Sequence, residues 1–409
     1  MLHLRVISAA ALLLIALLTR PGTADTNCRN TANFDSWVEA FKAEATVQGI
    51  SRIVISTAFD GIALDADVIR RDRAQRVFQQ SFLEFSDRMV SNYRLVRGVA
   101  LMKEHQTLFA RIEGEFGVPA PVIVAIWGME SDFGQNTGKF NIVRSLATLA
   151  YDCRRPAFFR RQLMDAMRIL QRGDLTIDEM IGNWAGELGP MQITTSDYFR
   201  AAVDFDVDGK RDAISSVPDT LASAANLLVG FGWRRDEPWL QEVRVPDNLP
   251  WDQADIVIQH PRSQWVAWGV TAAQGNLPAD SVPASLILPM GRFGPAFLVY
   301  NNFKAILAWN AATVYSTTVA YAATRLAGAP LVGRGNGAVS VLTMQQVQEL
   351  QHLLIQNRLM TGDADGRLGP MTRAAVKQAQ IKIGLPADSY PNQELIEQLR
   401  AKIPIVQKD

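Results

Sequence analysis

The sequence IWGMESDFG, at residues 126–134, decides the fold. It closes an apolar run over residues 121–129 that has no polar face, and this pattern predicts a short buried helix. Such a helix delivers Glu130 at its C-terminal end, beside aromatic rings. The partial negative charge of a helix C-terminus and the apolar surroundings both raise the pKa of a carboxyl group. An acid that stays protonated near neutral pH suits the protonation of a glycosidic oxygen; the alternative is a solvated glutamate at an ordinary helix end.

The composition of the whole chain excludes several classes of protein. The chain has 409 residues, enough for two or three domains with a sizeable core. Lysine plus arginine and aspartate plus glutamate balance at 41 each, so no overall positive field indicates a nucleic-acid partner. Hydrophobic residues make up 48% of the chain, which is typical of a globular protein.

The N-terminus has the pattern of an export signal. A positively charged start precedes an apolar run over residues 6–18, and small residues at 22–24 suit a cleavage site. The apolar run is short for a membrane span. We therefore predict a signal peptide over residues 1–24 and an exported mature protein without a stable membrane span. The alternative is an uncleaved anchor.

Export gives a meaning to the two cysteines, Cys28 and Cys153. An even pair in an oxidising compartment indicates a disulfide, here between the mature N-terminus and the segment after the Glu130 stretch. Two unpaired buried thiols are the alternative. The chain has too few cysteines and histidines for a zinc site.

Helical periodicity dominates the first half of the chain. Residues 25–120 carry apolar side chains at helical spacing, and further helices are predicted over residues 160–172 and 217–229. Between these helices, residues 180–193 read MIGNWAGELGPMQI. The glycines and the proline suggest a backbone held close to a ligand, with one amide side chain to bond it and one tryptophan to stack on a sugar ring. A helix–helix connection packed by that tryptophan is the alternative.

An aspartate-rich segment follows. Residues 204–212, with the sequence DFDVDGKRD, have calcium-loop spacing at their start and glycine in the sixth place. The twelfth place holds Ser215 and not a glutamate. Turns of this kind also arise from local bonds between side chains and backbone. A bound metal ion and a turn held by such local bonds are therefore equal alternatives for Asp204, Asp206 and Asp208, and we place neither a metal ligand nor a cofactor in the predicted site.

The rest of the chain changes character twice. Prolines separate short β-rich pieces over residues 235–300, which predicts a small, partly β lobe. Helix is expected to return over residues 297–303 and 309–315, with Phe297 and Phe303 packed in the core.

The C-terminal part begins with a segment of glycines and small residues over 326–338, which has the composition of a flexible linker. Residues 345–399 then form a compact module of three predicted helices. This module is small for an active site of its own, so a binding or docking role is the better interpretation.

With these pieces laid out, the chain resembles the B-type lytic murein transglycosylases with a C-terminal peptidoglycan-binding domain. The motifs that carry the resemblance are WGMESDFG at 127–134, YDCRR at 151–155, NWAGELGPMQ at 183–192 and VDFDVDG at 203–209. The sequence DGRLGPMT at 365–372 separately resembles the three-helix peptidoglycan-binding fold.

The resemblance implies a mainly α fold. It places a lysozyme-like α domain with a small partly β lobe over residues 25–326, a linker over 327–338 and a three-helix peptidoglycan-binding domain over 339–409. The expected protein is a periplasmic enzyme whose partners are peptidoglycan glycan strands and other cell-wall enzymes.

The resemblance also implies a mechanism with Glu130 as the single catalytic residue and without water as nucleophile. The glutamic acid protonates the oxygen between N-acetylmuramic acid and N-acetylglucosamine. Its carboxylate then takes the proton of the muramyl C6 hydroxyl, which attacks C1 and leaves a 1,6-anhydro ring. Because the ring closure is intramolecular, its high effective molarity supplies much of what a second carboxylate would do.

Substrate contacts are implied on the same basis. Two amides, Gln192 and Asn310, match family residues that contact the substrate. The complete substrate-binding set that we predict is Gln192, Asn310, Asn183, Trp184, Tyr198 and Trp309.

The chain departs from the family pattern at several positions. Asn183 replaces a usual serine, and Trp309 stands where tyrosine is common. Glu187 replaces a more neutral residue, and an ionised Glu187 close to Glu130 would raise that pKa further. We favour the alternative for Glu187, an exposed surface carboxylate. Two other functions remain open, a muramidase that uses water and a wall-binding protein without catalysis.

Overall fold

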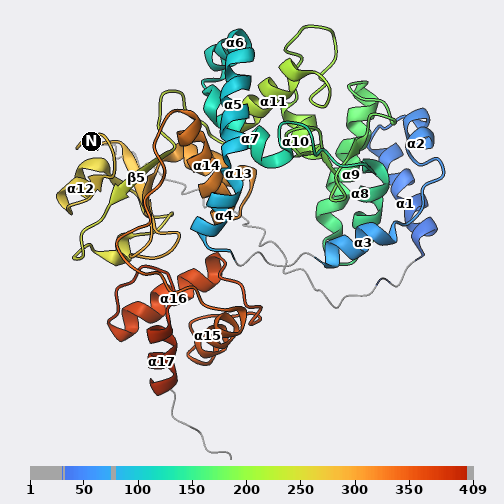
Figure 1. The fold of residues 1–409 in the computed structure, drawn as a ribbon. Helices are drawn as coiled ribbons and strands as arrows, with labels where there is room; N and C mark the ends of the chain where they lie inside the picture. Colours follow the sequence, from blue (N-terminus) through green and yellow to red (C-terminus); the bar gives the residue numbers. More distant parts are fainter. Residues whose placement is uncertain (1–29, 31–32, 75–79, 403–409) are drawn as a thin grey trace, which may run out of the picture.

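The computed structural model describes residue 30 and residues 33–74 and 80–402. Helices dominate this part of the chain, and α7 (Ala120–Ser131) lies in the middle of them (Figure 1). Nine of its 12 residues are buried, because it is apolar on every side and is covered by α5 (Asn92–Glu104) and α14 (Thr313–Leu326). The buried helix predicted from the sequence is confirmed, with Glu130 in its last turn.

Two groups of helices flank the Glu130 region. The first group contains α1 (Phe34–Val47), α2 (Arg52–Ala58), α3 (Ala66–Arg73), α8 (Ile142–Tyr151), α9 (Pro156–Arg172) and α10 (Thr195–Ala201). The second group surrounds α7 with α4 (Phe82–Met89), α5, α6 (Gln106–Phe116), α11 (Val217–Gly230), α13 (Asn301–Trp309) and α14. The helices predicted for this half are confirmed, and α9 begins earlier than expected because Pro156 occupies its first turn.

A small antiparallel sheet lies among the helices of the first group. Its strands follow in chain order as β1 (Phe140–Asn141), β2 (Ile181–Gly182), β3 (Glu187–Leu188) and β4 (Ile193–Thr194). Gly138 allows two backbone segments to approach each other closely here, since a Cβ at this position would lie 2.2 Å from the carbonyl oxygen of Gly182. Strands of two residues leave no periodic pattern, so the sequence did not predict this sheet.

The lobe predicted over residues 235–300 is a five-stranded antiparallel sheet. Its order is β6-β8-β9-β5-β7, with β5 (Leu240–Arg244), β6 (His260–Pro261), β7 (Thr271–Ala272), β8 (Pro283–Ile287) and β9 (Ala296–Val299), accompanied by the short helices η1 (Trp251–Gln253) and α12 (Arg262–Ala267). The lobe has a separate hydrophobic core, which contains the fully buried Trp265. The prediction of helix from residue 297 was wrong, because 297–299 belong to β9 and α13 begins at Asn301. Phe297 and Phe303 are buried as expected.

The segment that joins α14 to the C-terminal module has no helix or strand, but it makes bonds to the rest of the protein. The backbone N–H of Gly333 donates to Glu242, at 2.7 Å. Arg334 pairs with Asp87 at 2.7 Å, and the N–H of Asn336 donates to the carbonyl of Phe293 at 2.8 Å. The linker expected from composition is thus a segment without regular structure that forms several hydrogen bonds, and its flexibility stays a prediction.

The module consists of three helices, α15 (Met344–Gln356), α16 (Pro370–Ile383) and α17 (Gln393–Lys402), around a core of its own. It is docked on the lobe. Arg373 donates to the carbonyl oxygen of Pro289 at 2.7 Å, and Lys377 pairs with Asp255 at 2.9 Å. The bond from Lys377 places α16 against the segment that follows η1, and the bond from Arg373 places it against the segment that follows β8. Figure 1 shows α16 on the side of the module that faces the lobe.

Within the described residues, no single helix has the length and apolar composition of a membrane span, and only the bent pair of α6 and α7 meets that test jointly.

The packing of α7 generates a testable prediction. A Cβ at Gly128 would lie 2.8 Å from the ring of Phe133, so Gly128→Ala overpacks the turn that follows the helix and should lower the free energy of unfolding by about 1–2 kcal/mol. Gly114→Ala in α6 is the matched control, because a Cβ there meets nothing within 4 Å. It should raise stability by about 0.5–1 kcal/mol. Urea unfolding of both variants measures the change in the free energy of unfolding. Equal changes in the two variants would contradict the predicted overpacking at Gly128.

Candidate active site

The carboxyl group of Glu130 is held by two donors from the corner between α13 and α14. The indole Nε1–H of Trp309 donates to Oε1 at 3.1 Å, and the hydroxyl of Tyr315 donates to the same oxygen at 2.5 Å. Within the described residues Oε2 has no hydrogen-bond partner. The free oxygen is therefore the one that can carry a proton toward a ligand.

The helix end that presents Glu130 is fixed by its neighbours. Asp132 adopts a left-handed conformation with φ 50°, which aspartate tolerates better than most residues, and its carboxylate accepts from Arg94 at 2.7 Å. Ser131 donates to the carbonyl of Pro190 at 2.6 Å. The end of α7 is thus tied to α5 on one side and to the β3–β4 turn on the other.

The pKa of Glu130 is raised to about 7. Burial of the carboxyl group is the largest cause, and the negative charge of Glu187 adds to it. The hydrogen bonds from Tyr315 and Trp309 act in the opposite direction, because they stabilise the ionised form. The pKa increase predicted from the sequence is confirmed, and the acid is poised near neutral pH.

Glu187 is not the exposed surface carboxylate that we favoured from the sequence. It lies in β3, it is largely buried, and burial raises its pKa. The amide of Asn183 donates to it, and the positive charge of Arg155 lowers its pKa in part. A buried hairpin strand holds Glu187 there, and the sequence pattern did not reveal that strand.

Three predicted substrate contacts lie in one hairpin beside these acids. The Nδ2 group of Asn183 donates to Oε1 of Gln192 at 2.9 Å as well as to Glu187. Gln192 in turn donates to the carbonyl of Gly189 at 2.8 Å. Trp184 is half-buried at the tip of the turn. The structure brings these three side chains and Glu187 together on the β2–β3–β4 segment.

The other predicted contacts divide into two cases. Trp309 bonds Glu130 directly, and the adjacent Asn310 is partly exposed, with its side chain accepting from the N–H of Ala312 at 3.0 Å. Tyr198 has no exposed surface, and its hydroxyl donates to the carbonyl of Arg211. A side chain without exposed surface cannot contact a sugar, so the prediction for Tyr198 is corrected. Tyr315 was missed, because no sequence pattern links it to Glu130.

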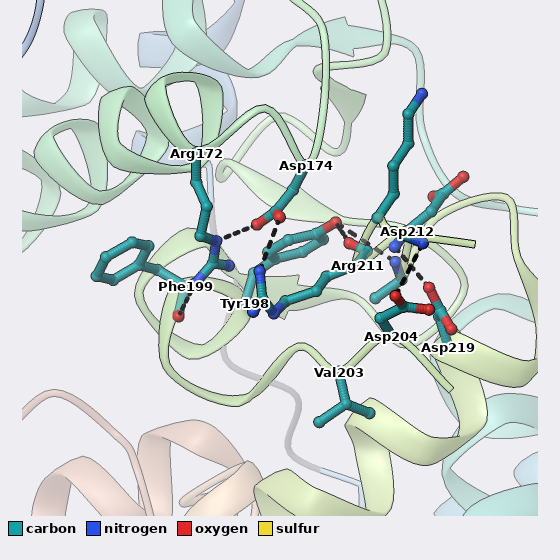
Figure 2. A network of polar contacts seen from close by, with 12 residues as sticks. Arg172, Asp174, Tyr198, Phe199, Val203, Asp204, Arg211, Asp212 and Asp219 are labelled. Atoms are coloured by element: carbon teal, nitrogen blue, oxygen red, sulfur yellow. Dashed lines mark hydrogen bonds and ion pairs between the residues drawn. The ribbon is translucent and has the colours of Figure 1, made fainter. Parts of the chain in front are cut away.

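The aspartate-rich loop forms a polar network that includes Tyr198. Figure 2 shows Tyr198 and Arg211 beside Asp174, with Asp204 and Asp219 on the other side of the loop. Asp204, Asp206 and Asp219 offer oxygen atoms within 4.8 Å of one another. The buried Asp219 already accepts the backbone N–H groups of Phe205 at 2.6 Å and Asp212 at 2.8 Å. These bonds hold the loop conformation without an ion, and the three oxygen atoms could also hold one, so both alternatives from the sequence stand.

One end of the predicted disulfide can be placed. Cys153 follows α8 and is partly buried, next to the buried carboxylate of Asp152. Cys28 lies outside the described residues, so the disulfide stays a prediction.

Together, the fold and the site define a class of protein. A lysozyme-like helical frame presents one dehydrated glutamic acid at a helix end, and amide and aromatic side chains surround it. This arrangement is typical of an enzyme that protonates a glycosidic oxygen.

Comparison with known proteins identifies the family. The model of the transglycosylase SLT domain matches residues 33–324, and the model of a putative peptidoglycan binding domain matches residues 343–399. The chain belongs to the family of proteins with a transglycosylase SLT domain. Membrane-bound lytic murein transglycosylase B of Escherichia coli (strain K12) is 27% identical over 244 residues, and the match spans 58% of this chain and 65% of that protein.

Solved structures agree with this assignment. SltB3 from Pseudomonas aeruginosa, in complex with NAG-anhNAM-pentapeptide, is similar with a TM-score of 0.83 and 38% identity, covering 90% of this chain and 99% of that chain. The soluble lytic transglycosylase SltB1 from the same organism has a TM-score of 0.62 and 26% identity, covering 71% and 98%.

The contacts of Glu130 predict the pH dependence of catalysis. In the mechanism that the resemblance implies, Glu130 acts in its protonated form, so kcat/KM should fall as the pH rises through about 7. Tyr315→Phe removes a bond that favours the ionised form and should move this fall to higher pH. Glu187→Gln removes a charge that raises the pKa and should move it to lower pH.

The control for this pH profile is Glu115→Gln, an exposed glutamate of α6, which should leave the profile unchanged. Shifts of Tyr315→Phe and Glu187→Gln in the same direction would contradict the electrostatic account.

Proposed function

We propose that this protein is a lytic murein transglycosylase that cleaves the bond between N-acetylmuramic acid and N-acetylglucosamine and forms 1,6-anhydro ends, with Glu130 as its single acid and base. The observation that carries the proposal is the pKa of about 7 for a carboxyl group with one bonded and one free oxygen. The family and the complexes of SltB3 with peptidoglycan fragments support the substrate class.

The first step uses the protonated acid. The proton on Oε2 passes to the glycosidic oxygen, and the bond from this oxygen to C1 of the muramyl residue breaks. The bonds from Trp309 and Tyr315 to Oε1 stabilise the carboxylate that this step creates. They are most useful once the negative charge has formed, which is what transition-state stabilisation requires.

The second step uses the carboxylate. Glu130 takes the proton of the C6 hydroxyl as O6 bonds to C1, and the glutamic acid is regenerated. The reaction consumes no water. Because the nucleophile belongs to the sugar itself, its position substitutes for a second catalytic group.

Substrate contacts follow from the hairpin and from the corner after α13. We assign Asn183, Gln192 and Asn310 to hydrogen bonds with substrate amides and hydroxyls. Trp184 and Trp309 offer aromatic surface to sugar rings, and Trp309 does so while bonding Glu130.

The proposal extends to export and to the organisation of the chain. We propose a signal peptide over residues 1–24, a periplasmic catalytic part over 25–326, a connecting segment over 327–338 and a peptidoglycan-binding part over 339–409. The matching family model over residues 343–399 supports the role of the last part.

One observation supports a second candidate function. Glu187 is a largely buried acid whose charge acts on Glu130, so it offers the additional group that a water-using muramidase needs. The products distinguish the two reactions. A transglycosylase releases muropeptides lighter by one water and resistant to borohydride, whereas a hydrolase releases reducible ends.

A Glu130→Gln variant tests the catalytic assignment. It should abolish release of anhydro-muropeptides from purified sacculi, measured by mass spectrometry before and after borohydride reduction, because glutamine cannot donate the proton. Binding to sacculi should stay near that of the parent. The variant should also melt no lower than the parent at pH 8, since it removes a buried charge. Unchanged release of anhydro-muropeptides would contradict the catalytic role of Glu130.

The disulfide gives a separate test of export. Non-reducing peptide mapping of the protein purified from the periplasm should yield one mass that joins the peptides of Cys28 and Cys153. Reduction should separate them and should lower the melting temperature, because the bridge closes a loop of the unfolded chain. A mature N-terminus other than residue 25 would revise the cleavage site, and two alkylated thiols would rule out the bridge.

A further inference from the structure

The β2–β3–β4 hairpin beside Glu130 holds a hydrogen-bond network with Asn183 at its centre. The Nδ2 group of Asn183 donates one hydrogen to Oε2 of Glu187 and the other to Oε1 of Gln192, the latter at 2.9 Å. Its Oδ1 accepts the backbone N–H groups of Ala185 at 2.9 Å and Glu187 at 3.1 Å. A primary amide has two donors and two acceptor positions, so all four positions of Asn183 are occupied.

Gln192 has little hydrogen-bonding capacity left as well. Its Nε2 group donates to the carbonyl oxygens of Gly189 at 2.8 Å and Thr137 at 3.2 Å, so both hydrogens are used. Its Oε1 keeps one free lone pair beside the bond from Asn183. A substrate that takes a donor from Asn183 or Gln192 therefore has to replace one of these bonds.

Glu187 differs from the two amides because one of its carboxylate oxygens is unused. Oε2 accepts from Asn183, whereas Oε1 has no hydrogen-bond partner within the described residues. In the same part of the chain, the fully enclosed side-chain atoms without a partner are Trp127 Nε1, Arg155 Nε and Thr220 Oγ1. The free oxygen of Glu187 is not one of them, so it reaches the surface although most of the side chain is buried.

The cation closest in effect to Glu187 is already engaged elsewhere. The positive charge of Arg155 acts on Glu187, but its Nη2 group donates to the buried carboxylate of Asp72 at 2.8 Å. A largely buried carboxylate with a free oxygen gains from a donor that a ligand supplies, because hydrogen bonds to an ionised acceptor are stronger than those between neutral groups.

The free oxygens of Glu130 and Glu187 belong to one site. The charge of Glu187 acts on Glu130 and also on Tyr315, which donates to Glu130. We infer that Oε1 of Glu187 accepts a hydrogen bond from a hydroxyl or acetamido N–H of a sugar that flanks the cleaved bond, and that Asn183 positions Glu187 for this contact. This inference rests on the proposed function for the identity of the sugar.

The network also explains why positions 183 and 187 depart from the family pattern together. A serine at position 183 would have a single O–H donor, whereas Asn183 donates to Glu187 and to Gln192 at the same time. An acid at position 187 thus depends on an amide at position 183 to hold it. The two departures form one unit that adds a carboxylate to the substrate side of the hairpin.

The test measures kcat and KM of the full-length protein for the release of anhydro ends from peptide-free glycan strands. Glu187→Gln keeps a carbonyl oxygen for Asn183 but places an NH2 group at the free position, so a donor faces the donor of the sugar and KM should rise about tenfold. Glu187→Asp keeps the charge but withdraws both oxygens by one methylene group. Its KM should rise about threefold, with kcat within about twofold of the parent.

The matched control is Asp178→Asn, which removes the charge of an exposed acid in the turn before β2 and should change neither constant. Asn183→Ser tests the positioning role. Because Asn183 acts through Glu187, the double variant Asn183→Ser/Glu187→Gln should raise KM by less than the product of the two single effects. Independent effects that multiply would contradict this role.

De-N-acetylated glycan strands distinguish the two kinds of donor. If Glu187 bonds the nitrogen at C2, an ammonium there enlarges the ratio of KM between Glu187→Gln and the parent, whereas a bond to a hydroxyl leaves this ratio the same. An unchanged KM in Glu187→Gln would overturn the contact. A loss confined to kcat, with reducible ends as product, would overturn it too and assign Glu187 to water activation.

Failure of the proposed function gives a different result. A parent that releases no anhydro ends would overturn that function alone, because the affinity of the parent and of the Glu187 variants for the same strands, measured by calorimetry, still tests the contact. Equal affinities in the parent, Glu187→Gln and Glu187→Asp would then overturn the contact as well.

Discussion

The rest of the structure depends on keeping one carboxyl group out of water. Glu130 is raised to a pKa of about 7 mainly by burial, and a helix of apolar residues is required to produce that burial at a helix end. Two donors on a single oxygen then limit the increase in pKa, because they stabilise the ionised form. The acid is balanced between groups that oppose its charge and groups that favour it.

That balance is assembled from segments far apart in the chain. The helix end comes from α7, the two donors come from the corner near residue 310, and the opposing charge comes from the β3 strand near residue 187. Ser131 and Asp132 join the helix end to its neighbours through one hydrogen bond to Pro190 and one ion pair to Arg94. A small displacement of any of these segments changes the distance on which the pKa of Glu130 depends.

The sequence predicted the individual helices and residues of this site better than the contacts between them. The apolar run before Glu130 predicted a buried helix and, through that burial, the direction of the pKa shift. Glu187 was misjudged because its burial depends on two-residue strands that only tertiary pairing creates. Tyr198 was expected to contact substrate because of the family resemblance, but it is fully buried and its hydroxyl bonds Arg211. Tyr315 lies 185 residues from its partner, and only the folded chain reveals their bond.

The fixed docking of the module on the lobe has a consequence for movement on the cell wall. When a binding domain is joined to a catalytic domain by a flexible linker, the catalytic domain can reach any bond within the length of the linker. The length of the linker then sets the effective concentration of substrate. Here Arg373 and Lys377 remove that freedom. Under the proposed function, the wall-bound module and the bond that is cleaved are therefore a constant distance apart, so the protein has to dissociate from the wall and bind again to reach a bond outside that range.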